Sequence, residues 1–380
     1  MIIGQVLDKF MPIIATWMYS QIDSLRKMGV QSKVFCHKTL NLDIYKHKPI
    51  FSFKDTSKAK ENLFGKLATE KNEDAATLYW NEILQKEKVD LIHSHSGLMA
   101  MKGIDLALKN NLPHLVTFYG ADTTRDPFGN SPLQRQYQKK LPLIFKKSNL
   151  ILCTSRFLKK SLVKIGAPAY KIKVWHLGID LNLFKKGTKK NDKFKIISCG
   201  RFKEWKGQKY LILALLRLLK KYKNIEVVFT GTGEKLDQCK KLVKKLGLER
   251  YVNFKGELPK HSQVAKEMAS SHIIVHSSFT GRNKANDALG MVLVEAGACE
   301  VPAVASRSGG IPEAVIDKKT GFLVEPKNPK QIAEKIILLM ENESLRKKMG
   351  QEARKYVQKE FDLSKQIRKL KKIYQKVIRK

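Results

Sequence analysis

The segment from Asn286 to Val315 places the strongest constraint on what this chain can fold into. Gly290 precedes an apolar run with helical spacing that begins at Met291, which predicts a helix whose first N–H groups stay unpaired. Free N–H groups and the positive end of the helix dipole favour a bound phosphate. Asp287 precedes this helix and Glu295 lies inside it, where a carboxylate can accept hydrogen bonds from sugar hydroxyls. Phosphate at one end and ribose at the other predict a nucleotide-sugar site; the alternative is an ordinary helix with a surface glutamate.

A second motif, Gly-Arg-Phe-Lys-Glu-Trp-Lys-Gly at 200–207, follows an apolar run of strand length, Phe194–Cys199. Arg201 and Lys206 lie five positions apart on this loop, between an expected strand and an expected helix. Two cations on one loop can hold a diphosphate. The alternative is a solvated basic loop, because the chain has 73 Lys and Arg residues against 35 Asp and Glu, a formal net charge of +38.

Strand-length apolar runs alternate with helical segments along the chain, a pattern typical of doubly wound α/β domains with parallel sheets. Because 380 residues are too many for one ordinary hydrophobic core, we expect two such domains. We place the first domain at 1–185, a linker at 186–193 and the second domain at 194–360. A basic amphipathic helix at 361–380 is expected to pack back on the first domain. The expected strands are 2–7, 30–37, 89–96, a run from 115, 148–155, 194–199, 225–231, 251–256, 270–277, 301–305 and 322–324.

Polar residues follow two buried strands of the first domain. His95 and Ser96 end one strand, and Tyr119, Gly120 and Asp122 follow the next. Ligands of doubly wound sheets bind beyond the carboxyl ends of the strands, so these residues are candidate ligand contacts. Both positions have structural alternatives, since a histidine at a strand end often only supports its neighbours and an aspartate after glycine often caps a helix.

These motifs resemble the donor-binding signature of the family-4 retaining glycosyltransferases, in which two glutamates eight positions apart flank a helix that begins at glycine. The segments G-M-V-L-V-E-A, V-P-A-V-A-S and G-G-I-P-E-A-V match this signature, and G-R-x-x-x-x-K-G matches the family's diphosphate loop. The first acidic position is Asp287 rather than glutamate, and Tyr119 replaces the histidine of the family's T-x-H-G-x-D motif. The pattern Met11-Pro12-x-x-x-Thr16 is closer to the subset that builds surface polysaccharides, such as colanic acid.

The resemblance implies a GT-B fold, two Rossmann-like domains that face a central cleft, with the donor nucleotide on the second domain and the acceptor mostly on the first. It implies that Arg201 and Lys206 hold the donor diphosphate. It further implies that Glu295 holds ribose hydroxyls and that Asp287 holds hydroxyls of the transferred sugar. Tyr119 then has a positioning role, because a phenol with a pKa of about 10 is a poor proton acceptor at neutral pH. The other implied donor-binding residues are Gly200, Gly231, Gly233, Gly256, Leu258, Leu289, Gly290, Met291 and Val292. The implied acceptor-side residues are His95, Ser96, Gly120, Asp122 and Arg156.

The implied activity is transfer of a hexose from a UDP- or GDP-sugar to a saccharide or lipid-linked acceptor, with retention, in the synthesis of cell-surface polysaccharide or lipopolysaccharide. The chain has no Asp-x-Asp metal motif, so neither a metal nor a cofactor is expected. The alternative is a non-catalytic polyanion-binding protein on a decayed transferase scaffold, which would account for Tyr119, Asp287 and the net charge. No specific nucleic-acid partner is expected, because no nucleic-acid motif is present.

Cysteine usage and hydrophobicity predict a cytoplasmic protein. The five cysteines form no CxxC pair, and Cys36, Cys153 and Cys199 lie in or beside expected strands, so we expect buried thiols in a reducing compartment. The longest uncharged run, Phe10–Ile22, has 13 residues, fewer than the ~20 that span a bilayer. The basic tail at 365–380 has two interpretations, a helix packed on the first domain or a helix on the anionic inner face of the plasma membrane.

Overall fold

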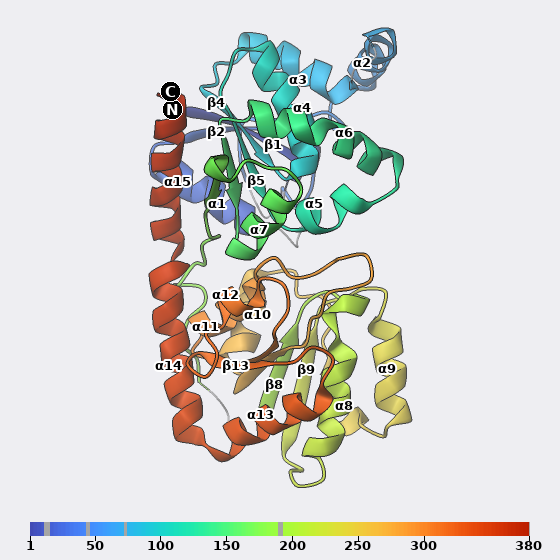
Figure 1. The fold of residues 1–380 in the computed structure, drawn as a ribbon, viewed down its shortest axis with the longest axis vertical. Helices are drawn as coiled ribbons and strands as arrows, with labels where there is room; N and C mark the ends of the chain where they lie inside the picture. Colours follow the sequence, from blue (N-terminus) through green and yellow to red (C-terminus); the bar gives the residue numbers. More distant parts are fainter. Residues whose placement is uncertain (11–15, 43–45, 72–73, 189–192, 380) are drawn as a thin grey trace. The chain divides into compact units, whose positions relative to one another are not determined.

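The chain forms two compact units in a computed structural model that describes residues 1–10, 16–42, 46–71, 74–188 and 193–379 (Figure 1). The first unit comprises Met1–Gly178 and Ser364–Lys380, and the second comprises Ile179–Leu363. The units therefore divide after residue 178 and not within 186–193, where the sequence placed a linker. Hydrogen bonds explain this difference, because Ile179 donates to the Phe361 carbonyl (2.7 Å) and accepts from the Leu363 N–H (3.0 Å). Residues 11–15, which hold most of the Met-Pro-x-x-x-Thr pattern, lie outside the described residues.

The first unit is built on a parallel sheet with the strand order β3-β2-β1-β4-β5-β6-β7. Its strands are β1 (Ile2–Phe10), β2 (Gln31–Thr39), β3 (Ile50–Ser52), β4 (Leu91–His95), β5 (His114–Phe118), β6 (Leu150–Cys153) and β7 (Ile172–Val174). Its longer helices are α1 (Thr16–Lys27), α2 (Lys58–Lys71), α3 (Ala75–Lys86), α4 (Gly97–Lys109), α6 (Pro132–Lys147), α7 (Arg156–Lys164) and α15 (Leu363–Ile378), and α5 (Ala121–Thr124) is one turn. Every residue of β4 and β5 is buried, as expected for parallel strands covered by helices on both faces.

The second unit contains a parallel sheet with the strand order β10-β9-β8-β11-β12-β13. Its strands are β8 (Phe194–Cys199), β9 (Ile225–Thr230), β10 (Val252–Phe254), β11 (Ile273–His276), β12 (Ala303–Ser306) and β13 (Gly321–Val324). Its helices include α8 (Gln208–Leu218), α9 (Leu236–Lys245), α10 (His261–Ala269), α11 (Met291–Ala298), α12 (Ile311–Ala314), α13 (Pro329–Glu341) and α14 (Glu343–Glu360). Two parallel-sheet Rossmann-like domains were expected from the sequence, and this expectation is confirmed.

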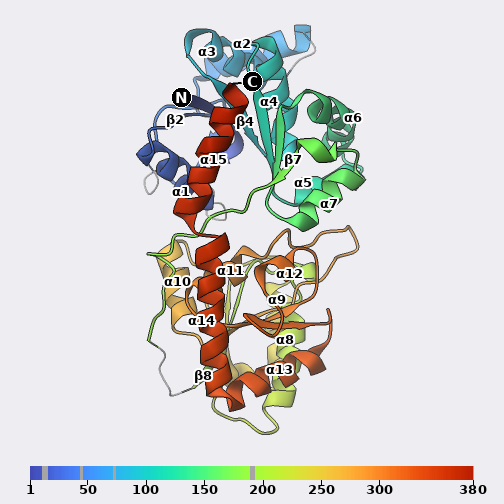
Figure 2. The same cartoon turned by 60° about the vertical axis from the view of Figure 1, so that its left-hand side comes forward.

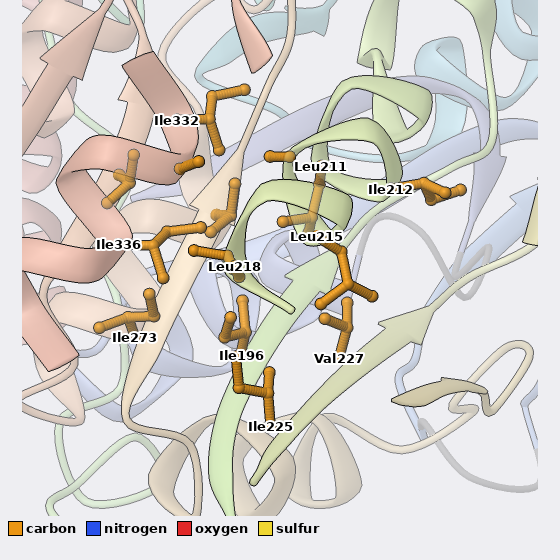
Figure 3. Packing of buried hydrophobic residues seen from close by; sticks show 14 of the residues in the cluster. Ile196, Leu211, Ile212, Leu215, Leu218, Ile225, Val227, Ile273, Ile332 and Ile336 are labelled. Carbon is orange, nitrogen blue, oxygen red and sulfur yellow. The ribbon is translucent and has the colours of Figure 1, made fainter. Parts of the chain in front are cut away.

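Apolar side chains from helices and strands interleave in the core of the second unit. Figure 3 shows Leu211, Leu215 and Leu218 of α8 beside Ile196 of β8 and beside Ile332 and Ile336 of α13, and all six side chains are fully buried. Burying one such leucine or isoleucine contributes about 1.5–3 kcal/mol, so this layer holds the sheet and its helices as one rigid support for the loops at the strand ends.

The C-terminal helix α15 packs on the first unit (Figure 2). Its Tyr374 hydroxyl lies 2.7 Å from Nδ1 of His93 in β4, and its Gln366 carbonyl accepts a hydrogen bond from the Trp175 indole (3.0 Å). The apolar residues at helical spacing, Ile367, Leu370, Ile373 and Val377, are all buried. Burial of this face accounts for the apolar stripe of the tail, while the basic residues lie on the other side of the helix.

Two details of the fold were not predicted. The edge strand β3 lies within a segment, 38–70, that has no clear periodicity in the sequence, and its three residues are too few to show an alternating pattern. The strand β7 is equally short. All five cysteines are buried and none forms a disulfide within the described part of the chain, which confirms the buried thiols expected at Cys36, Cys153 and Cys199.

Candidate functional site

In the second unit, the predicted donor motifs follow the two strands at which the strand order reverses. β8 and β11 lie side by side, and the chain proceeds from β8 toward one edge of the sheet and from β11 toward the other. Loops that leave neighbouring strands in opposite directions open a crevice at their carboxyl ends, where ligands of doubly wound sheets bind. Residues 200–207 follow β8, and the segment that leads to Gly290 follows β11. The topology thus brings both motifs to the carboxyl ends of two adjacent strands.

Lys206 and Asp287 form an ion pair between these two loops. The Lys206 ammonium donates to Asp287 Oδ1 at 2.7 Å, and His276 Nε2–H at the end of β11 donates to Oδ2 at 2.8 Å. Both side chains of the ion pair are little exposed, 12% for Lys206 and 10% for Asp287. Burial alone raises the pKa of Asp287, but Lys206 and His276 together outweigh it and hold this pKa well below its usual range. Asp287 is therefore an anion at neutral pH, and its charge holds Lys206 in place.

His276 is a partner of Asp287 that the sequence did not indicate. Its ring is buried, and its Nε2 also lies 3.0 Å from the hydroxyl of Ser278. The available signal was its position as the last residue of the strand before the Asp287 segment. The ion pair does not exclude the expected contact between Asp287 and the transferred sugar, because each carboxylate oxygen has a second lone pair.

Close backbone packing joins the two loops. A Cβ on Gly207 would lie 2.3 Å from the carbonyl oxygen of Ser277, and Gly207 has φ of +66°, so only glycine fits there. The Ser277 hydroxyl donates to the Gly207 carbonyl (2.7 Å). Likewise, Gly310 approaches Ala288 so closely that a Cβ would lie 1.9 Å from the Ala288 carbonyl oxygen. These contacts fix Lys206 and Asp287 relative to each other.

Helix α11 begins without a side-chain cap. Gly290 is its N-cap in the left-handed conformation, with φ of +87°, and no described side chain accepts from the first turn of the helix. Leu289 is buried, while Met291 and Val292 are half-buried. This is the arrangement that the sequence predicted for a phosphate site.

Glu295 lies in the middle of α11 and is half-buried. Among the described residues, none donates a hydrogen bond to its carboxylate, and burial raises its pKa to about 7. A partly buried carboxylate whose lone pairs have no protein donor can accept hydrogen bonds from a ligand. Its charge at neutral pH will depend on whether a ligand supplies those donors.

The two predicted cations, Arg201 and Lys206, have different surroundings in the structure. Lys206 lies in the ion pair with Asp287, whereas the side chain of Arg201 is exposed and has no ion-pair partner among the described residues. The backbone of Arg201 is fixed, because its carbonyl accepts from Gln208 Nε2 at 3.0 Å. Arg201 is thus anchored at its backbone, while its guanidinium end extends into solvent.

The remaining predicted donor-binding residues lie in loops at the same edge of the sheet. Gly200, Gly231 and Gly256 follow β8, β9 and β10, and the Gly231 N–H donates to the Gly256 carbonyl (2.6 Å). Gly233 packs against Phe202, and Leu258 is half-buried in the loop after β10. Their roles in donor binding stay predictions.

In the first unit, the strand order reverses between β1 and β4, and a hydrogen-bonded chain lies there. His95 Nε2–H at the end of β4 donates to Gln5 Oε1 of β1 at 2.7 Å, so its Nδ1 accepts from the Tyr119 hydroxyl, also at 2.7 Å. Burial lowers the pKa of His95 to about 3 and raises the pKa of Tyr119 well above its usual value. Both groups are therefore neutral near pH 7.

Asp122 holds two loops of the first unit together. Its carboxylate accepts from the backbone N–H groups of Gly97 (2.9 Å), Gly120 (2.8 Å) and Tyr119 (3.2 Å), and it is buried. Burial raises its pKa to about 6, although these three N–H donors act in the opposite direction. These contacts favour the structural alternative for Asp122, in which its carboxylate holds the loops after β4 and β5 together.

Ser96 and Arg156 begin helices at the same edge. The Ser96 hydroxyl accepts from the Met99 N–H (3.3 Å) at the start of α4, and Ser96 has a positive φ of 105°. Gly120 is the N-cap of α5, and Arg156 is exposed in the first turn of α7. Their contact with an acceptor stays a prediction.

Comparison with known proteins agrees with the motifs. A family model described as "Glycosyltransferase Family 4" matches residues 14–183, and one described as "Glycosyl transferases group 1" matches residues 180–356. The uncharacterized glycosyltransferase MJ1178 of Methanocaldococcus jannaschii is 30% identical over 298 residues, 78% of this chain and 78% of that protein. The chain belongs to the group 1 and family 4 glycosyltransferases. A second glycosyltransferase of the same organism, MJ1069, is 31% identical over 244 residues, which cover 62% of this glycosyltransferase and 60% of the relative, less than two thirds of its length.

Solved structures share the fold of this glycosyltransferase. HepE of Anabaena, crystallised in complex with UDP and glucose, matches with a TM-score of 0.81 over 99% of this chain and 100% of HepE, at 20% sequence identity. The match confirms the GT-B class of two Rossmann-like domains that the sequence predicted. None of the helices in the described part of the chain is long and apolar enough to cross a bilayer.

Proposed function

We propose that this glycosyltransferase moves a hexose from a UDP- or GDP-sugar to a saccharide or lipid-linked acceptor, with retention of configuration and without a metal ion. The observation that carries the proposal is the Lys206–Asp287 pair beside the uncapped start of α11. A cation and a helix start without a side-chain cap support a diphosphate site here, and the half-buried Glu295 lies on the same helix. The resemblance to polysaccharide-building relatives supports a role in cell-surface polysaccharide or lipopolysaccharide synthesis.

In the proposed reaction, the bond between the sugar C1 and the diphosphate oxygen breaks, and a bond from C1 to the acceptor oxygen forms on the same face. The acceptor proton passes to an oxygen of the leaving diphosphate. Lys206, Arg201 and the N–H groups after Gly290 stabilise the negative charge that grows on this group, and a preorganised donor of this kind lowers a barrier by about 3–4 kcal/mol. Asp287 accepts hydrogen bonds from the transferred sugar, and Glu295 accepts from the ribose.

A panel of nucleotide sugars tests the proposal. Thermal unfolding is followed in EDTA with UDP- and GDP-linked glucose, galactose, mannose and N-acetylglucosamine. At a concentration 100 times its Kd, a donor that binds the folded protein raises the free energy of unfolding by about 2.7 kcal/mol. We expect an upward shift in Tm with at least one donor and hydrolysis or transfer of that donor. A shift that requires added divalent metal would contradict metal independence, and no shift with any donor would contradict donor binding.

The net charge favours a second candidate, a polyanion-binding protein that has lost catalysis. A formal charge of +38 attracts any phosphate-rich polymer. Salt-dependent binding to DNA or polyphosphate without binding of a nucleotide sugar in the same panel would favour this alternative.

We further propose that the protein is cytoplasmic and binds the anionic inner face of the plasma membrane through α15. Its apolar side is buried in the first unit, and its exposed side carries no acidic residue. The exposed basic residues of α15 are Lys365, Arg368, Lys369, Lys372 and Lys376. Each such cation contributes about 1 kcal/mol to binding of an anionic surface.

Charge removal on α15 tests this membrane proposal. The double variant Lys369→Gln/Lys372→Gln is expected to lower the affinity for phosphatidylglycerol vesicles about 30-fold, since two contributions of ~1 kcal/mol are lost. Co-sedimentation with vesicles measures the effect. The control is Lys240→Gln/Lys241→Gln, which removes the same charge from exposed positions of α9. Equal losses in both variants would show that net charge, and not α15, governs binding.

A further inference from the structure

His276 is held in the middle of the second sheet. It is the last residue of β11, a strand that lies between β8 and β12, and its Cα pairs with that of Ala305 in β12. Its side chain is only 3% exposed. Residues on strands are held more precisely than residues on loops. The position of this imidazole is therefore set by the sheet and not by the loops around the ion pair.

The imidazole gives Asp287 a second anchor. Nε2–H of His276 donates to Asp287 Oδ2 at 2.8 Å and the Lys206 ammonium donates to Oδ1 at 2.7 Å, so each carboxylate oxygen has a protein donor. The backbone of Asp287 is also fixed, because its carbonyl accepts from the Gly310 N–H (2.8 Å). Rotation of the carboxylate would break one or both side-chain bonds, and each oxygen keeps a lone pair for a ligand.

The two anchors of Asp287 differ in what else they can bind. Lys206 carries its ammonium on a flexible stem with three N–H donors, so it can bind a diphosphate as well as Asp287. His276 has a single proton at Nε2. The other described group near this nitrogen is the Ser278 hydroxyl at 3.0 Å, two residues further along the chain. His276 therefore stays with Asp287 when Lys206 engages an anion.

We propose that His276 is a positioning residue, which keeps the Asp287 carboxylate directed at the transferred sugar while Lys206 holds the leaving diphosphate. This inference rests on the proposed sugar transfer and deepens it, because it assigns recognition of the sugar, apart from recognition of the nucleotide, to a residue of a central strand. A residue that only supports the fold would affect binding of nucleotide and sugar alike. A residue that acts through Asp287 changes the contribution of the sugar alone.

Two affinities of the full-length protein test this role, one for a nucleotide sugar that raises its Tm and one for the matching nucleoside diphosphate. Isothermal titration measures both at about pH 8, where the terminal phosphate is ionised. His276→Asn withdraws the hydrogen-bond donor from Asp287, because an asparagine amide reaches as far as Nδ1 of histidine and not as far as Nε2. It is expected to weaken binding of the nucleotide sugar about tenfold, the effect of one hydrogen bond to a charged group. Binding of the nucleoside diphosphate is expected to stay within about twofold.

Three further variants separate the hydrogen bond from the fold. His276→Gln places an amide nitrogen at the reach of Nε2 and is expected to retain the affinity for the nucleotide sugar within about threefold. His276→Leu removes the donor without leaving a new polar group unpaired, and it is expected to match His276→Asn. The control is His272→Leu, since His272 is buried directly before the same strand and accepts from the Lys195 N–H (3.0 Å). It is expected to leave both affinities unchanged.

Thermal unfolding of each variant shows whether it is folded. The positioning role is overturned if folded His276→Asn or His276→Leu binds the nucleotide sugar as the wild-type protein does, or if both ligands weaken equally. It is also overturned if His276→Gln loses as much affinity as His276→Asn. Each of these results leaves the proposed donor site intact. A wild-type protein that binds no nucleotide sugar would contradict the proposed function and this inference together.

Discussion

Replacing Lys206 by alanine is expected to lower turnover about 1000-fold, because it removes a preorganised cation aimed at the leaving diphosphate. The ammonium is held 2.7 Å from Asp287 and only 12% of the side chain is exposed, so the cation has a fixed position. Initial rates at saturating donor and acceptor measure the effect on kcat.

Lys203 supplies the matched control, since it lies on the same loop but is more exposed and pairs with Glu234 at 2.8 Å. Lys203→Ala is expected to keep kcat within about twofold, as for most surface changes. Lys206→Ala also leaves the buried Asp287 with His276 as its remaining partner, and breaking a buried pair costs about 3–5 kcal/mol of stability. The double variant Lys206→Ala/Asp287→Asn removes the unpaired charge, so recovery of stability without recovery of kcat is expected. Near-normal kcat in a folded Lys206→Ala protein would remove Lys206 from the diphosphate site.

The sequence predicts the fold well because the strands of parallel sheets are buried on both faces. Strands such as β4 and β5 are continuous buried runs, and such runs are visible without any knowledge of pairing. The division between the units was not visible, because it depends on backbone bonds between Ile179 and the segment 361–363, far along the chain. Short edge strands such as β3 carry too few residues for any periodicity.

The sequence names candidate site residues but not the contacts between them. Local pattern was enough to single out Lys206 and Gly290 as candidates, since loop glycines and helix starts are local features. The partnership of Lys206 with Asp287 joins residues 81 positions apart, and His276 has no local signature at all. Long-range pairs of this kind are fixed by the strand order, which a single sequence does not encode in any short motif.

The contacts of Tyr119 could not be predicted for the same reason, because they are made with residues far along the chain. The sequence shows only that a tyrosine stands where the resembling family has histidine, which leaves open a weakened or altered activity. The hydrogen bond to His95, and the bond from His95 to Gln5 of another strand, define the direction of the Tyr119 hydroxyl. In the sequence, Tyr119 in place of histidine suggests lost activity. In the fold, it belongs to a continuous chain of hydrogen bonds through His95 to Gln5.

Donor binding is expected to weaken about tenfold per pH unit below about pH 7, because it requires the ionised form of Glu295. In the free protein, burial raises the pKa of Glu295 to about 7, so the carboxyl is increasingly protonated as the pH falls below 7. Ribose hydroxyls that donate to the carboxylate favour its charged form, so the bound state has a lower pKa than the free state. Binding therefore releases a proton near and below pH 7, and affinity falls as the pH falls. Isothermal titration with the nucleotide sugar between pH 5.5 and 8 measures this slope; free UDP is avoided because a terminal phosphate itself titrates near about pH 6.

Glu295→Gln is expected to abolish the pH slope, since the amide has no charge to lose in this range. Glu295→Ala is expected to lower donor affinity about 100-fold at pH 8, where the wild-type carboxyl is ionised and two charge-assisted hydrogen bonds of about 1.5–3 kcal/mol are at stake. Glu300→Gln is the matched control, because Glu300 lies five positions further along and its carboxylate is already held by Lys186 at 3.0 Å. It should retain both the affinity and the pH slope of the wild-type protein. A slope that persists in Glu295→Gln would assign the titrating group elsewhere, and unchanged affinity in Glu295→Ala would remove Glu295 from the ribose site while leaving the Lys206 site untouched.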